Sequence, residues 1–402
     1  MTRPRYKMTE IGEIPEEWNL KRIRDCAKVK YGKSNPKTKG MIPLIGSSGV
    51  FGSVSEPLTY TSTIVIGRKG TAGAVWDIRT PSWPSDTTFY LEYKTEISQK
   101  FLFEFMSLNK LTGENAKTTL PSVKREEIEE FIFPFPPLSE QQKIAEILST
   151  ADETIQKVNE EITFTEKLKK GLMQTLLTKG TGHTKFKMTE IGEIPENWGI
   201  SELRKIFKII TGTTPSTKIK KYWTGGTLEW LTPKDLSQMN DNLIISTSER
   251  KVTSEALNES NLNLLPEGSI LISTRAPVGY VGINRTPITF NQGCKGLVPL
   301  LSEGYSSFFY AYYLKYKREF LNSVSSGSTF KELSKERLER LVVPIPPRLE
   351  QQKIAEILST VNQKLELLRN KRTHLKELKK GLMGDLLTGK VRVKVETSNG
   401  EN

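Results

Sequence analysis

The chain has 402 residues, and its 59 Lys and Arg residues outnumber its 46 Asp and Glu residues, which gives a formal net charge of +13. A single hydrophobic core rarely serves so long a chain, so we expect two globular units with something between them. The two cysteines, Cys26 and Cys294, exclude a disulfide framework and favour a reducing, cytoplasmic setting. No stretch approaches the roughly 18 apolar residues of a membrane span, so we expect no membrane partner.

The opening segment of the chain returns near its middle. Residues 7–16 read KMTEIGEIPE, residues 187–196 repeat them, and Trp18 or Trp198 follows each copy. A chance repeat of this length is negligible, so one unit has been duplicated. We expect the two copies to do equivalent jobs.

The sequence after each repeated opening diverges. Residues 19–117 and 199–327 show little similarity, although both contain short β-rich runs separated by Gly, Pro and Asn and followed by a helical pattern. Each unit is therefore predicted to be a mixed α+β domain. The predicted strands are Thr63–Ile66, Ala74–Trp76, Ser269–Ser273 and Gly296–Pro299, and the predicted helices are Gln99–Leu108 and Phe308–Phe320.

Loops rich in Lys, Arg, Ser and Thr interrupt these predicted strands. Residues 64–73 align weakly with 270–279, and in both a hydrophobic strand ends in a loop that carries a cation and a glycine. Such loops suit DNA reading, in which Arg and Lys pair with guanine and Asn or Gln with adenine. The alternative is a set of turns with solvated cations. The candidate DNA-binding residues are Lys33, Ser34, Asn35, Lys37, Lys39, Arg68, Lys69, Lys117, Thr118, Thr119, Thr213, Thr214, Lys218, Lys220, Lys221, Thr274, Arg275, Asn291, Gln292, Ser328 and Lys331.

Two tryptophans, Trp223 and Trp230, flank a Gly-Gly turn in the second divergent region. Their rings have the size and shape to touch a nucleic acid. Large aromatic side chains more often fill a hydrophobic core, so we predict a core role for both.

A long helix is predicted after the Pro-rich segment 133–138. Ser139 and Gln142 form a capping-box pattern, and the prolines block a helix before them. The undecapeptide EQQKIAEILST follows at 140–150 and recurs, identical, at 350–360. Apolar residues continue at the alternating spacing of four and three that is typical of a coiled-coil seam. The seam residues are Ile144, Leu148, Ala151, Ile155, Val158 and Ile162 in the first copy and Ile354, Leu358, Val361, Leu365 and Leu368 in the second.

Each predicted helix is long enough to act as a spacer. A helix from about Ser139 to about Leu177 would be roughly 55–60 Å long, at about 1.5 Å per residue. Its apolar stripe needs a partner, and the other copy is the obvious one. We predict an antiparallel pair related by a two-fold axis, with the globular units at opposite ends. The alternative is two ordinary core helices in separate domains.

The hexapeptide LKKGLM also occurs twice and places Gly171 and Gly381 inside the predicted helices. A glycine within a helix costs about 1 kcal/mol relative to alanine. Its presence in both copies favours close packing or a bend at this point. A simply tolerated glycine is the alternative.

The positive charge lies mainly on the divergent regions. The spacer segment 139–180 carries 6 basic and 7 acidic residues, the segment 349–390 carries 9 and 5, and the last twelve residues are balanced. Most of the net charge therefore falls on the predicted globular units. This distribution suits a polyanionic partner such as nucleic acid, and a basic surface kept for solubility is the alternative.

Motifs for catalysis are missing. The sequence contains neither the Asn/Asp-Pro-Pro-aromatic tetrapeptide of amino-methyltransferases nor a Walker A loop. The only histidines, His183 and His374, lie in a Gly-rich stretch between the units and on the second predicted helix, so neither heads a triad or a zinc cluster. We therefore expect no metal site and no catalysis within this chain.

The repeated motifs together resemble the specificity subunits of type I restriction-modification systems, over essentially the whole chain. They are the IGEIPExW opening of each half, the Pro-Phe/Ile-Pro-Pro segment followed by EQQKIAEIL, and the LKKGLMxxLLT close. The resemblance implies that each divergent unit is a target recognition domain for one half of a split DNA sequence. It also implies that the repeated helices fix the half-site separation and dock two modification (methyltransferase) subunits. S-adenosylmethionine, ATP and Mg are then expected on the modification and restriction subunits, with no cofactor in this chain.

The predicted fold class is α+β, with two mixed α/β target recognition domains separated by two long antiparallel coiled-coil spacer helices in a pseudo-two-fold arrangement. The second divergent region is about 30 residues longer than the first, which implies two differently built domains and an asymmetric target. The alternatives are a stand-alone nuclease or methyltransferase and an adaptor that does not bind DNA. The predicted boundaries are 1–138 and 181–348 for the domains, 139–180 and 349–390 for the helices, and 391–402 for a disordered tail.

Overall fold

The structure is a computed structural model that describes residues 5–111, 121–239, 242–301, 303–325 and 332–394. The chain divides into two compact units. Unit 1 comprises residues 1–159 and 370–402, and unit 2 comprises residues 160–369. Each unit therefore contains one mixed α/β domain together with half of each long helix, a grouping that differs from the division by sequence.

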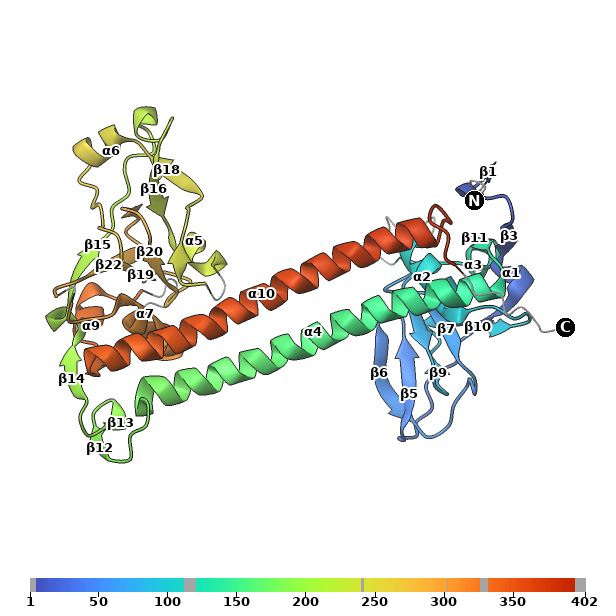
Figure 1. Cartoon of the computed structure of the whole chain (residues 1–402), viewed down its shortest axis with the longest axis horizontal. Coiled ribbons are helices and arrows are strands. Elements are labelled where there is room, and N and C mark those ends of the chain that lie inside the picture. The colour runs from blue at the N-terminus through green and yellow to red at the C-terminus, as the bar shows by residue number, and fades with distance from the viewer. Residues whose placement is uncertain (1–4, 112–120, 240–241, 302, 326–331, 395–402) are drawn as a thin grey trace. The chain divides into compact units, whose positions relative to one another are not determined.

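Two long helices pass from one unit into the other (Figure 1). They are α4 (Leu138–Lys179) and α10 (Arg348–Leu386). In unit 1, Lys379 of α10 lies 2.7 Å from Asp152 of α4, and in unit 2, Arg369 lies 2.7 Å from Glu166. Because residue numbers fall along one helix as they rise along the other, the two helices run antiparallel.

The predicted seam residues are all buried or half-buried, but they do not form one uniform seam. Ile144 and Leu148 belong to the hydrophobic core of unit 1. Ile354 and Leu358 belong to the core of unit 2. The first turns of each long helix are thus part of a globular domain. The predicted helix pair and the alternative of core helices in separate domains therefore each hold in part.

The long helices begin one residue earlier than predicted. The backbone N–H groups of Glu140 and Gln141 donate to the carbonyl of Pro137, at 2.9 and 3.0 Å. Ser139 already lies inside α4, so the capping box predicted from Ser139 and Gln142 is wrong. The equivalent carbonyl of Pro347 starts α10, where Leu349 replaces the serine. The proline carbonyl, rather than the serine, defines both helix starts.

Unit 1 opens with a hairpin formed by the repeated KMTEIGEIPE segment. Strands β1 (Tyr6–Thr9) and β2 (Gly12–Pro15) pair antiparallel, and Gly12 turns the chain with a φ of 104°, which favours glycine. Trp18 follows and is fully buried in the same core cluster as Ile14. The repeated opening is therefore a structural element of the domain.

Two sheets form the rest of the domain in unit 1. An antiparallel sheet has the order β4-β10-β7-β8, and a smaller one has the order β6-β5-β9, with β9 parallel to β5. The central strand β7 is apolar and buried along its whole length, as its sequence predicts. The strands are β3 (Asn19–Arg22), which pairs with β11 (Ile132–Phe135), β4 (Ala27–Tyr31), β5 (Ile42–Gly46), β6 (Gly49–Val54), β7 (Thr63–Gly67), β8 (Val75–Ile78), β9 (Trp83–Pro84) and β10 (Thr88–Tyr93).

Helix α2 (Gln99–Leu108) covers the sheet of unit 1, at the predicted position (Figure 1). It begins where the Ser98 hydroxyl accepts a hydrogen bond from the backbone N–H of Phe101 at 3.4 Å. Phe101, Leu102 and Phe105 bury their side chains, and each such burial is worth about 1.5–3 kcal/mol. The shorter helices of unit 1 are α1 (Ile23–Cys26) and α3 (Arg125–Glu129).

Unit 2 repeats this plan. Its hairpin has strands β12 (Phe186–Thr189) and β13 (Gly192–Pro195), and Trp198 is fully buried behind it. The larger sheet has the order β15-β22-β19-β20-β17, and the smaller has the order β18-β16-β21, with β21 parallel to β16. The strands are β14 (Gly199–Glu202), which pairs with β23 (Val342–Ile345), β15 (Phe207–Thr211), β16 (Leu228–Leu231), β17 (Ile244–Ile245), β18 (Arg250–Val252), β19 (Ile270–Ser273), β20 (Val281–Asn284), β21 (Thr289–Phe290) and β22 (Cys294–Pro299).

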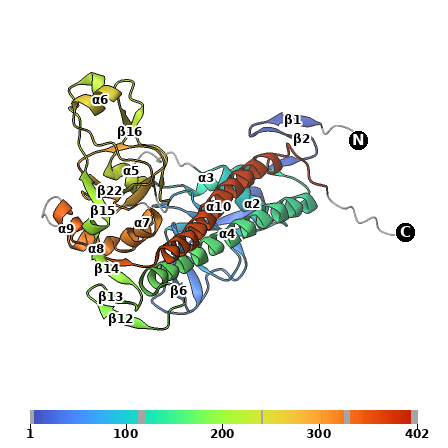
Figure 2. The same cartoon turned by 60° about the vertical axis from the view of Figure 1, so that its left-hand side comes forward.

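Most of the extra length of unit 2 lies between β16 and β19. At this position unit 1 has only β6, whereas unit 2 has α5 (Pro233–Gln238), β17, β18 and α6 (Ser254–Glu259). Within unit 2, α6 and β16 lie away from α7 (Figure 2). The predicted helix Phe308–Phe320 is two helices, α7 (Ser307–Tyr316) and α8 (Arg318–Ser323), because Lys317 leaves the helical conformation between them. The remaining helices are η1 (Leu203–Lys205), η2 (Lys220–Tyr222) and α9 (Lys335–Glu339).

The first two residues of the repeated undecapeptide join each long helix to its domain. In unit 1 the Trp18 indole N–H donates to the Glu140 carboxylate at 2.9 Å, and the Gln141 amide oxygen accepts from the backbone N–H of Ser98 at 3.0 Å. In unit 2, Glu350 accepts from Trp198 at 2.9 Å, and Gln351 accepts from Ser306 at 2.8 Å. We call this set of contacts between a long helix and its domain the joint. The same joint in both units partly explains why the undecapeptide is repeated.

The segment after each long helix closes this joint. In unit 2, Glu350 also accepts from the backbone N–H of Thr181 at 2.8 Å and contacts the His183 ring at 2.8 Å. In unit 1, Arg392 donates to Glu140 through two nitrogens, at 2.7 and 3.0 Å. Residues 391–402 were predicted to be a disordered tail, and for Arg392 this is wrong because its charge pairs with a buried carboxylate. Residues 395–402 lie outside the described part of the chain.

Candidate nucleic-acid interface

Three loops of unit 1 are tied together by backbone hydrogen bonds. The N–H groups of Arg68 and Lys69 both donate to the carbonyl of Thr87, at 2.8 and 3.3 Å. The N–H of Lys33 donates to the carbonyl of Pro84 at 3.1 Å. The loop after β4, the loop between β7 and β8, and the loop between β9 and β10 therefore meet at one edge of the domain.

Unit 2 builds the same framework from different residues. The N–H groups of Thr274 and Arg275 both donate to the carbonyl of Gly293, at 2.7 and 3.1 Å. The N–H of Thr213 donates to the carbonyl of Phe290 at 3.0 Å. The weak alignment of 64–73 with 270–279 therefore corresponds to a real structural equivalence.

A fourth segment joins each cluster. Val123 donates its N–H to the Arg68 carbonyl at 3.0 Å, and Leu333 donates to the Thr274 carbonyl at 2.8 Å. These segments follow the predicted candidates Lys117, Thr118, Thr119, Ser328 and Lys331, which lie outside the described residues. We call the two sets of loops the loop cluster of unit 1 (residues 32–39, 67–73, 84–88 and 122–123) and the loop cluster of unit 2 (residues 212–218, 273–279, 290–294 and 332–333).

Glycines allow the close approach of the loops. A Cβ on Gly32 would lie 1.9 Å from the Ser85 carbonyl oxygen, and a Cβ on Gly212 would lie 2.0 Å from that of Asn291. Both contacts are too short for any side chain. Gly32 and Gly212 stand at the same distance from the repeated opening, so the sequence contains the signal for this equivalence.

The loop cluster of unit 1 is open to solvent. Lys33, Ser34, Asn35, Lys37, Lys39 and Lys69 are exposed, and Arg68 is half-buried. The Arg68 guanidinium stacks 5.1 Å from the ring centre of Tyr31 and 5.9 Å from that of Phe89. This stacking holds the planar, donor-rich group at the surface, where it suits a phosphate or a guanine edge.

The loop cluster of unit 2 presents amides and a hydroxyl beside its cations. The exposed Gln292 accepts a hydrogen bond from the exposed Thr214. Arg275 is exposed and pairs with Glu332 at 3.2 Å. Thr213 is half-buried, and Lys218 and Lys220 are exposed along the same segment. The side chains offered here differ in type from those of unit 1.

Three predicted contacts of unit 2 have hydrogen-bond or ion-pair partners within the chain. Thr274 is fully buried and donates to the Gly293 carbonyl at 3.2 Å, so the prediction that it contacts DNA is wrong. Asn291 is half-buried, and its side-chain oxygen accepts from the Gly293 N–H at 2.9 Å to form the turn. Lys221 is exposed, and its ammonium pairs with Glu259 at 2.7 Å.

Sequence reasoning missed several residues of the clusters. Thr87 and Gly293 act through their backbone carbonyls, which no sequence pattern reveals. Tyr31 and Glu332 act through contacts with Arg68 and Arg275, between segments far apart in the chain. The position of Tyr31, at a strand end immediately before Gly32, was the one available signal.

A buried cation lies behind the loop cluster of unit 2. Lys295 is only 4% exposed, and its ammonium donates to the Gln292 carbonyl at 3.3 Å. Burial lowers the pKa of Lys295 below its ordinary value, although the nearby charge of Glu332 opposes this. The lysine therefore supports the backbone of a residue that is offered to solvent.

The described residues give no indication of a metal centre or a membrane span. Among them there is no group of three or more His, Cys, Asp or Glu side chains placed to hold a metal ion. Within the same residues, no helix combines the length and the apolar character needed to cross a bilayer.

A second set of exposed residues, which we call the repeated surface, occurs at equivalent positions in both units and lies outside the loop clusters. Met8 and Met188 of the two hairpins are 79% and 77% exposed, and Leu168 and Leu378 of the LKKGLM segments are 44% and 59% exposed. A Cβ on Gly171 or Gly381 would meet no atom of the described chain within 4 Å. Close packing inside the chain, one explanation offered for these glycines, is therefore wrong.

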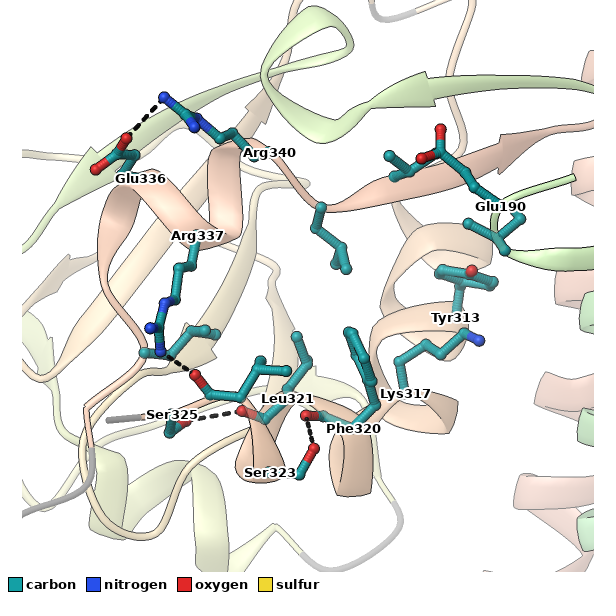
Figure 3. Close-up of a pocket in the computed structure, with 15 residues that line it drawn as sticks. Glu190, Tyr313, Lys317, Phe320, Leu321, Ser323, Ser325, Glu336, Arg337 and Arg340 are labelled. Atoms are coloured by element: carbon teal, nitrogen blue, oxygen red, sulfur yellow. Dashed lines mark hydrogen bonds and ion pairs between the residues drawn. The ribbon is translucent and has the colours of Figure 1, made fainter. Parts of the chain in front are cut away.

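A pocket lies beside the hairpin of unit 2 and has a smaller counterpart in unit 1. The pocket of unit 2 has a volume of about 1030 Å³, with Glu190 of the hairpin, Tyr313 and Lys317 on one side and Arg337 and Arg340 on the other (Figure 3). Burial lowers the pKa of Lys317. In unit 1 a pocket of about 250 Å³ is lined by Ile11 of the hairpin and by Phe105 and Asn109 at the end of α2. Both pockets stand at the same place in the repeated plan.

Comparison with known proteins first defines the class of this chain. A family model described as the type I restriction modification DNA specificity domain matches residues 15–164 and again residues 195–377. The two matches cover most of the chain, one in each half. The chain is therefore a protein with a duplicated DNA specificity domain.

Individual relatives give the same result. The chain is 30% identical over 433 residues to the putative type I restriction enzyme MjaX specificity subunit of Methanocaldococcus jannaschii, with 97% of each chain covered. The MjaIX specificity subunit of that organism is 40% identical over 204 residues, which are 51% of this chain and 46% of the relative. The chain therefore belongs to the specificity subunits of type I restriction-modification systems.

Solved structures share the fold. The S subunit of a type I restriction-modification system from M. genitalium has a TM-score of 0.61 and 18% identity, with 96% of this chain and 98% of that chain covered. At this identity the likeness concerns the fold alone. It agrees with the two mixed α/β domains and two long helices described above.

Proposed function

We propose that each unit reads one half of an asymmetric, two-part DNA target. The observation that supports this most is one backbone framework built twice with different exposed side chains. Unit 1 offers Arg68 and Lys69, whereas unit 2 offers Arg275 and the Thr214–Gln292 pair. Different donors and acceptors on equivalent frames select different base pairs.

Exposed lysines around the frames supply the sequence-independent part of binding. Lys33, Lys37 and Lys39 in unit 1, and Lys218 and Lys220 in unit 2, are exposed. Contacts with phosphates position a protein on the duplex, whereas contacts with base edges specify the sequence. Binding should therefore weaken steeply with salt, and the sequence preference should reside in the loop clusters.

We further propose that α4 and α10 set the distance between the half-sites. Each helix is continuous from one unit to the other, and a helix has a fixed rise of about 1.5 Å per residue. The base pairs between the half-sites would then go unread. Half-sites of a two-part reader are typically separated by about one turn of DNA, or about 34 Å.

The repeated surface is the proposed docking site for two modification subunits. Met8, Met188, Leu168 and Leu378 are exposed apolar residues, and they occur at equivalent positions although the domains around them have diverged. Gly171 and Gly381 leave open space beside the leucines. A partner that binds twice in the same way would bury these residues. Methyl transfer and cleavage are then assigned to the modification and restriction subunits, and this chain is non-catalytic.

Mapping of methylated bases tests the reading function. Genomic DNA is taken from a host that expresses this chain with its modification partners. We expect one bipartite sequence with an unread gap. Replacement of residues 19–117 by those of a relative should change one half of that sequence only. Methylation without a bipartite site, or a change in both halves, would contradict the proposal.

Insertion into the helices tests the spacer role. One heptad inserted into α4 and a matching heptad inserted into α10 preserve the seam and lengthen both helices by about 10 Å. The unread gap should become longer while both half-sequences stay the same. An unchanged gap would contradict the proposal that the helices set the half-site distance, and it would leave the proposal that each unit reads one half-site unaffected.

A further inference from the structure

In each loop cluster, one backbone carbonyl accepts a hydrogen bond from a tryptophan side chain. The Trp83 indole N–H donates to the carbonyl of Lys33 at 3.3 Å, and the Trp230 indole N–H donates to the carbonyl of Thr213 at 3.1 Å. Lys33 and Thr213 are equivalent, because each follows the glycine that starts the loop after β4 or β15. The same atom of the frame is therefore held in both units.

The two tryptophans come from different strands. Trp83 lies on β9, which pairs parallel with β5, and Trp230 lies on β16, which pairs parallel with β21. By the register of these pairs, Trp83 corresponds to Thr289 and Trp230 corresponds to Leu44. The two hydrogen bonds are thus not one inherited contact. They are two separate solutions that fix the same carbonyl.

Unit 2 holds its loop at a second point. The Trp223 indole N–H donates to the carbonyl of Ser216 at 3.1 Å, three residues beyond Thr213. The rings of Trp223 and Trp230 meet edge to face with centres 5.0 Å apart. The Arg250 guanidinium stacks 3.7 Å from the ring centre of Trp223 and 5.2 Å from that of Trp230. The longer loop of unit 2 therefore rests on a stack of two aromatic rings and a cation.

Fixing these carbonyls has a consequence for recognition. Thr214 follows the fixed carbonyl of Thr213, and it donates to Gln292 in the neighbouring loop. A loop that is fixed before binding loses less conformational entropy when it binds DNA. This advantage applies only to the conformation in which the loop is held. A held loop discriminates between bases, whereas a free loop adapts to several.

We propose that Trp83 and Trp230 are positioning residues that set the sequence discrimination of their own half-sites. Trp83 acts in unit 1, and Trp230 acts in unit 2 with support from Trp223 and Arg250. The proposal rests on the DNA-reading function of the two units. It predicts separate effects on the two half-sites, because the two hydrogen bonds belong to separate units.

Binding of short duplexes by the chain in complex with its modification subunits tests this proposal. One duplex carries the bipartite sequence found by methylation mapping, and two others carry a base change in only one half. Trp83→Phe and Trp230→Phe keep an aromatic ring but remove the donor. Loss of one net hydrogen bond predicts an about three- to tenfold drop in discrimination at the matching half-site, with the other half unchanged.

Two further variants separate positioning from a loss of folding. Trp76→Phe removes an indole N–H that is buried without a partner among the described residues, so discrimination should stay unchanged. Arg250→Met removes the exposed guanidinium over Trp223 and leaves the core of unit 2 in place. It should lower discrimination at the second half-site only, with an unchanged melting temperature.

The outcomes distinguish this inference from the function on which it rests. If the unmodified complex binds the duplex without preference for either half, the reading function itself fails, and this inference fails with it. If the unmodified complex discriminates and the Trp83→Phe, Trp230→Phe and Arg250→Met variants discriminate equally well, only the positioning role is overturned. Equal losses at both half-sites, accompanied by a lower melting temperature, would also overturn it.

Discussion

The joints of the two units use the same glutamate in different surroundings. Glu140 of unit 1 is almost fully buried and pairs with Arg392, in addition to accepting from Trp18. Glu350 of unit 2 accepts from Trp198, from the Thr181 backbone and from the His183 ring. Both units therefore keep the carboxylate and the tryptophan, while the closing segment supplies a guanidinium in unit 1 and a backbone N–H with an imidazole ring in unit 2.

The largest effect is expected from removal of these carboxylates. Glu140→Ala removes the buried acceptor of the Trp18 N–H and of Arg392, which keeps its ion pair with the exposed Glu17. Breaking a buried ion pair costs roughly 3–5 kcal/mol. Glu350→Ala leaves the Trp198 and Thr181 N–H groups without this acceptor, which costs roughly 1–3 kcal/mol. Chemical denaturation should therefore show a larger loss of stability for Glu140→Ala.

A matched control uses the exposed face of the same helix. Glu146 is 65% exposed, and among the described residues its carboxylate pairs with Lys143, so Glu146→Ala should change stability by less than about 1 kcal/mol. Hydrogen exchange should locate the loss around Trp18 in the first variant and around Trp198 in the second. Equal losses for Glu140→Ala and Glu350→Ala would contradict the distinction between the two joints.

The units also differ where the short domain helix meets the long helices. In unit 1, Lys100 of α2 pairs with Asp152 at 2.7 Å, and Glu104 of α2, which is 1% exposed, pairs with Lys379 at 3.0 Å. In unit 2, Asn362 stands in the repeat position of Asp152 and donates to the Tyr312 hydroxyl at 2.8 Å. Asp152 of unit 1 therefore forms ion pairs at a position where Asn362 of unit 2 forms a hydrogen bond to a hydroxyl.

This difference predicts a pH dependence of stability for unit 1. Burial alone would raise the pKa of Asp152, but hydrogen bonds from Lys100 and Lys379 outweigh it and hold this pKa below its ordinary value. Such a carboxylate stabilises the fold above its unfolded pKa of about 3.9, and this stabilisation is lost as the pH falls through the folded pKa. Asp152→Asn should therefore lower stability at pH 7 and make stability fall less between about pH 5 and pH 2.

The acid titration has its own control on the same helix. Glu153→Gln removes an acidic charge from an exposed position adjacent to Asp152 and leaves the ion pairs intact. Its stability should follow the pH in the same way as that of the unmodified chain. If Asp152→Asn also keeps the full acid dependence, the charged contact does not stabilise unit 1 as argued.

The smallest effect is expected from alanine at the two LKKGLM glycines, where helix stability and partner binding should change in opposite directions. Gly171→Ala and Gly381→Ala should each stabilise the isolated chain by up to about 1 kcal/mol, because nothing in the described chain opposes a methyl group there. If a modification subunit packs on this surface, both substitutions should weaken its binding. Thermal denaturation of the chain and titration with purified modification subunit measure the two effects.

Gly384 provides the matched control. It also has open space around it, but the repeat position in α4 is Gln174, so a partner that docks in the same way on both helices must tolerate a side chain there. Gly384→Ala should stabilise the chain and leave partner binding unchanged. Unchanged binding for all three alanine variants would argue against docking on the LKKGLM surface.

Much of this protein is determined by its sequence alone. The repeats of KMTEIGEIPE and EQQKIAEILST predict the duplication, and apolar periodicity predicts α4, α10 and α2, because local pattern and burial agree in these elements. Loops with cations, such as those at Lys33, Arg68 and Arg275, were also found from sequence, since their residue types suit DNA.

Only the tertiary structure decided which of these residues are exposed and what holds them. Thr274 and Arg275 are neighbours in sequence, yet one is fully buried and the other is exposed. The carbonyls of Thr87 and Gly293, and the indole bonds of Trp83 and Trp230, join segments far apart in the chain. Such contacts depend on distances between folded segments, and a backbone carbonyl has the same chemistry in every residue, so no sequence pattern identifies them.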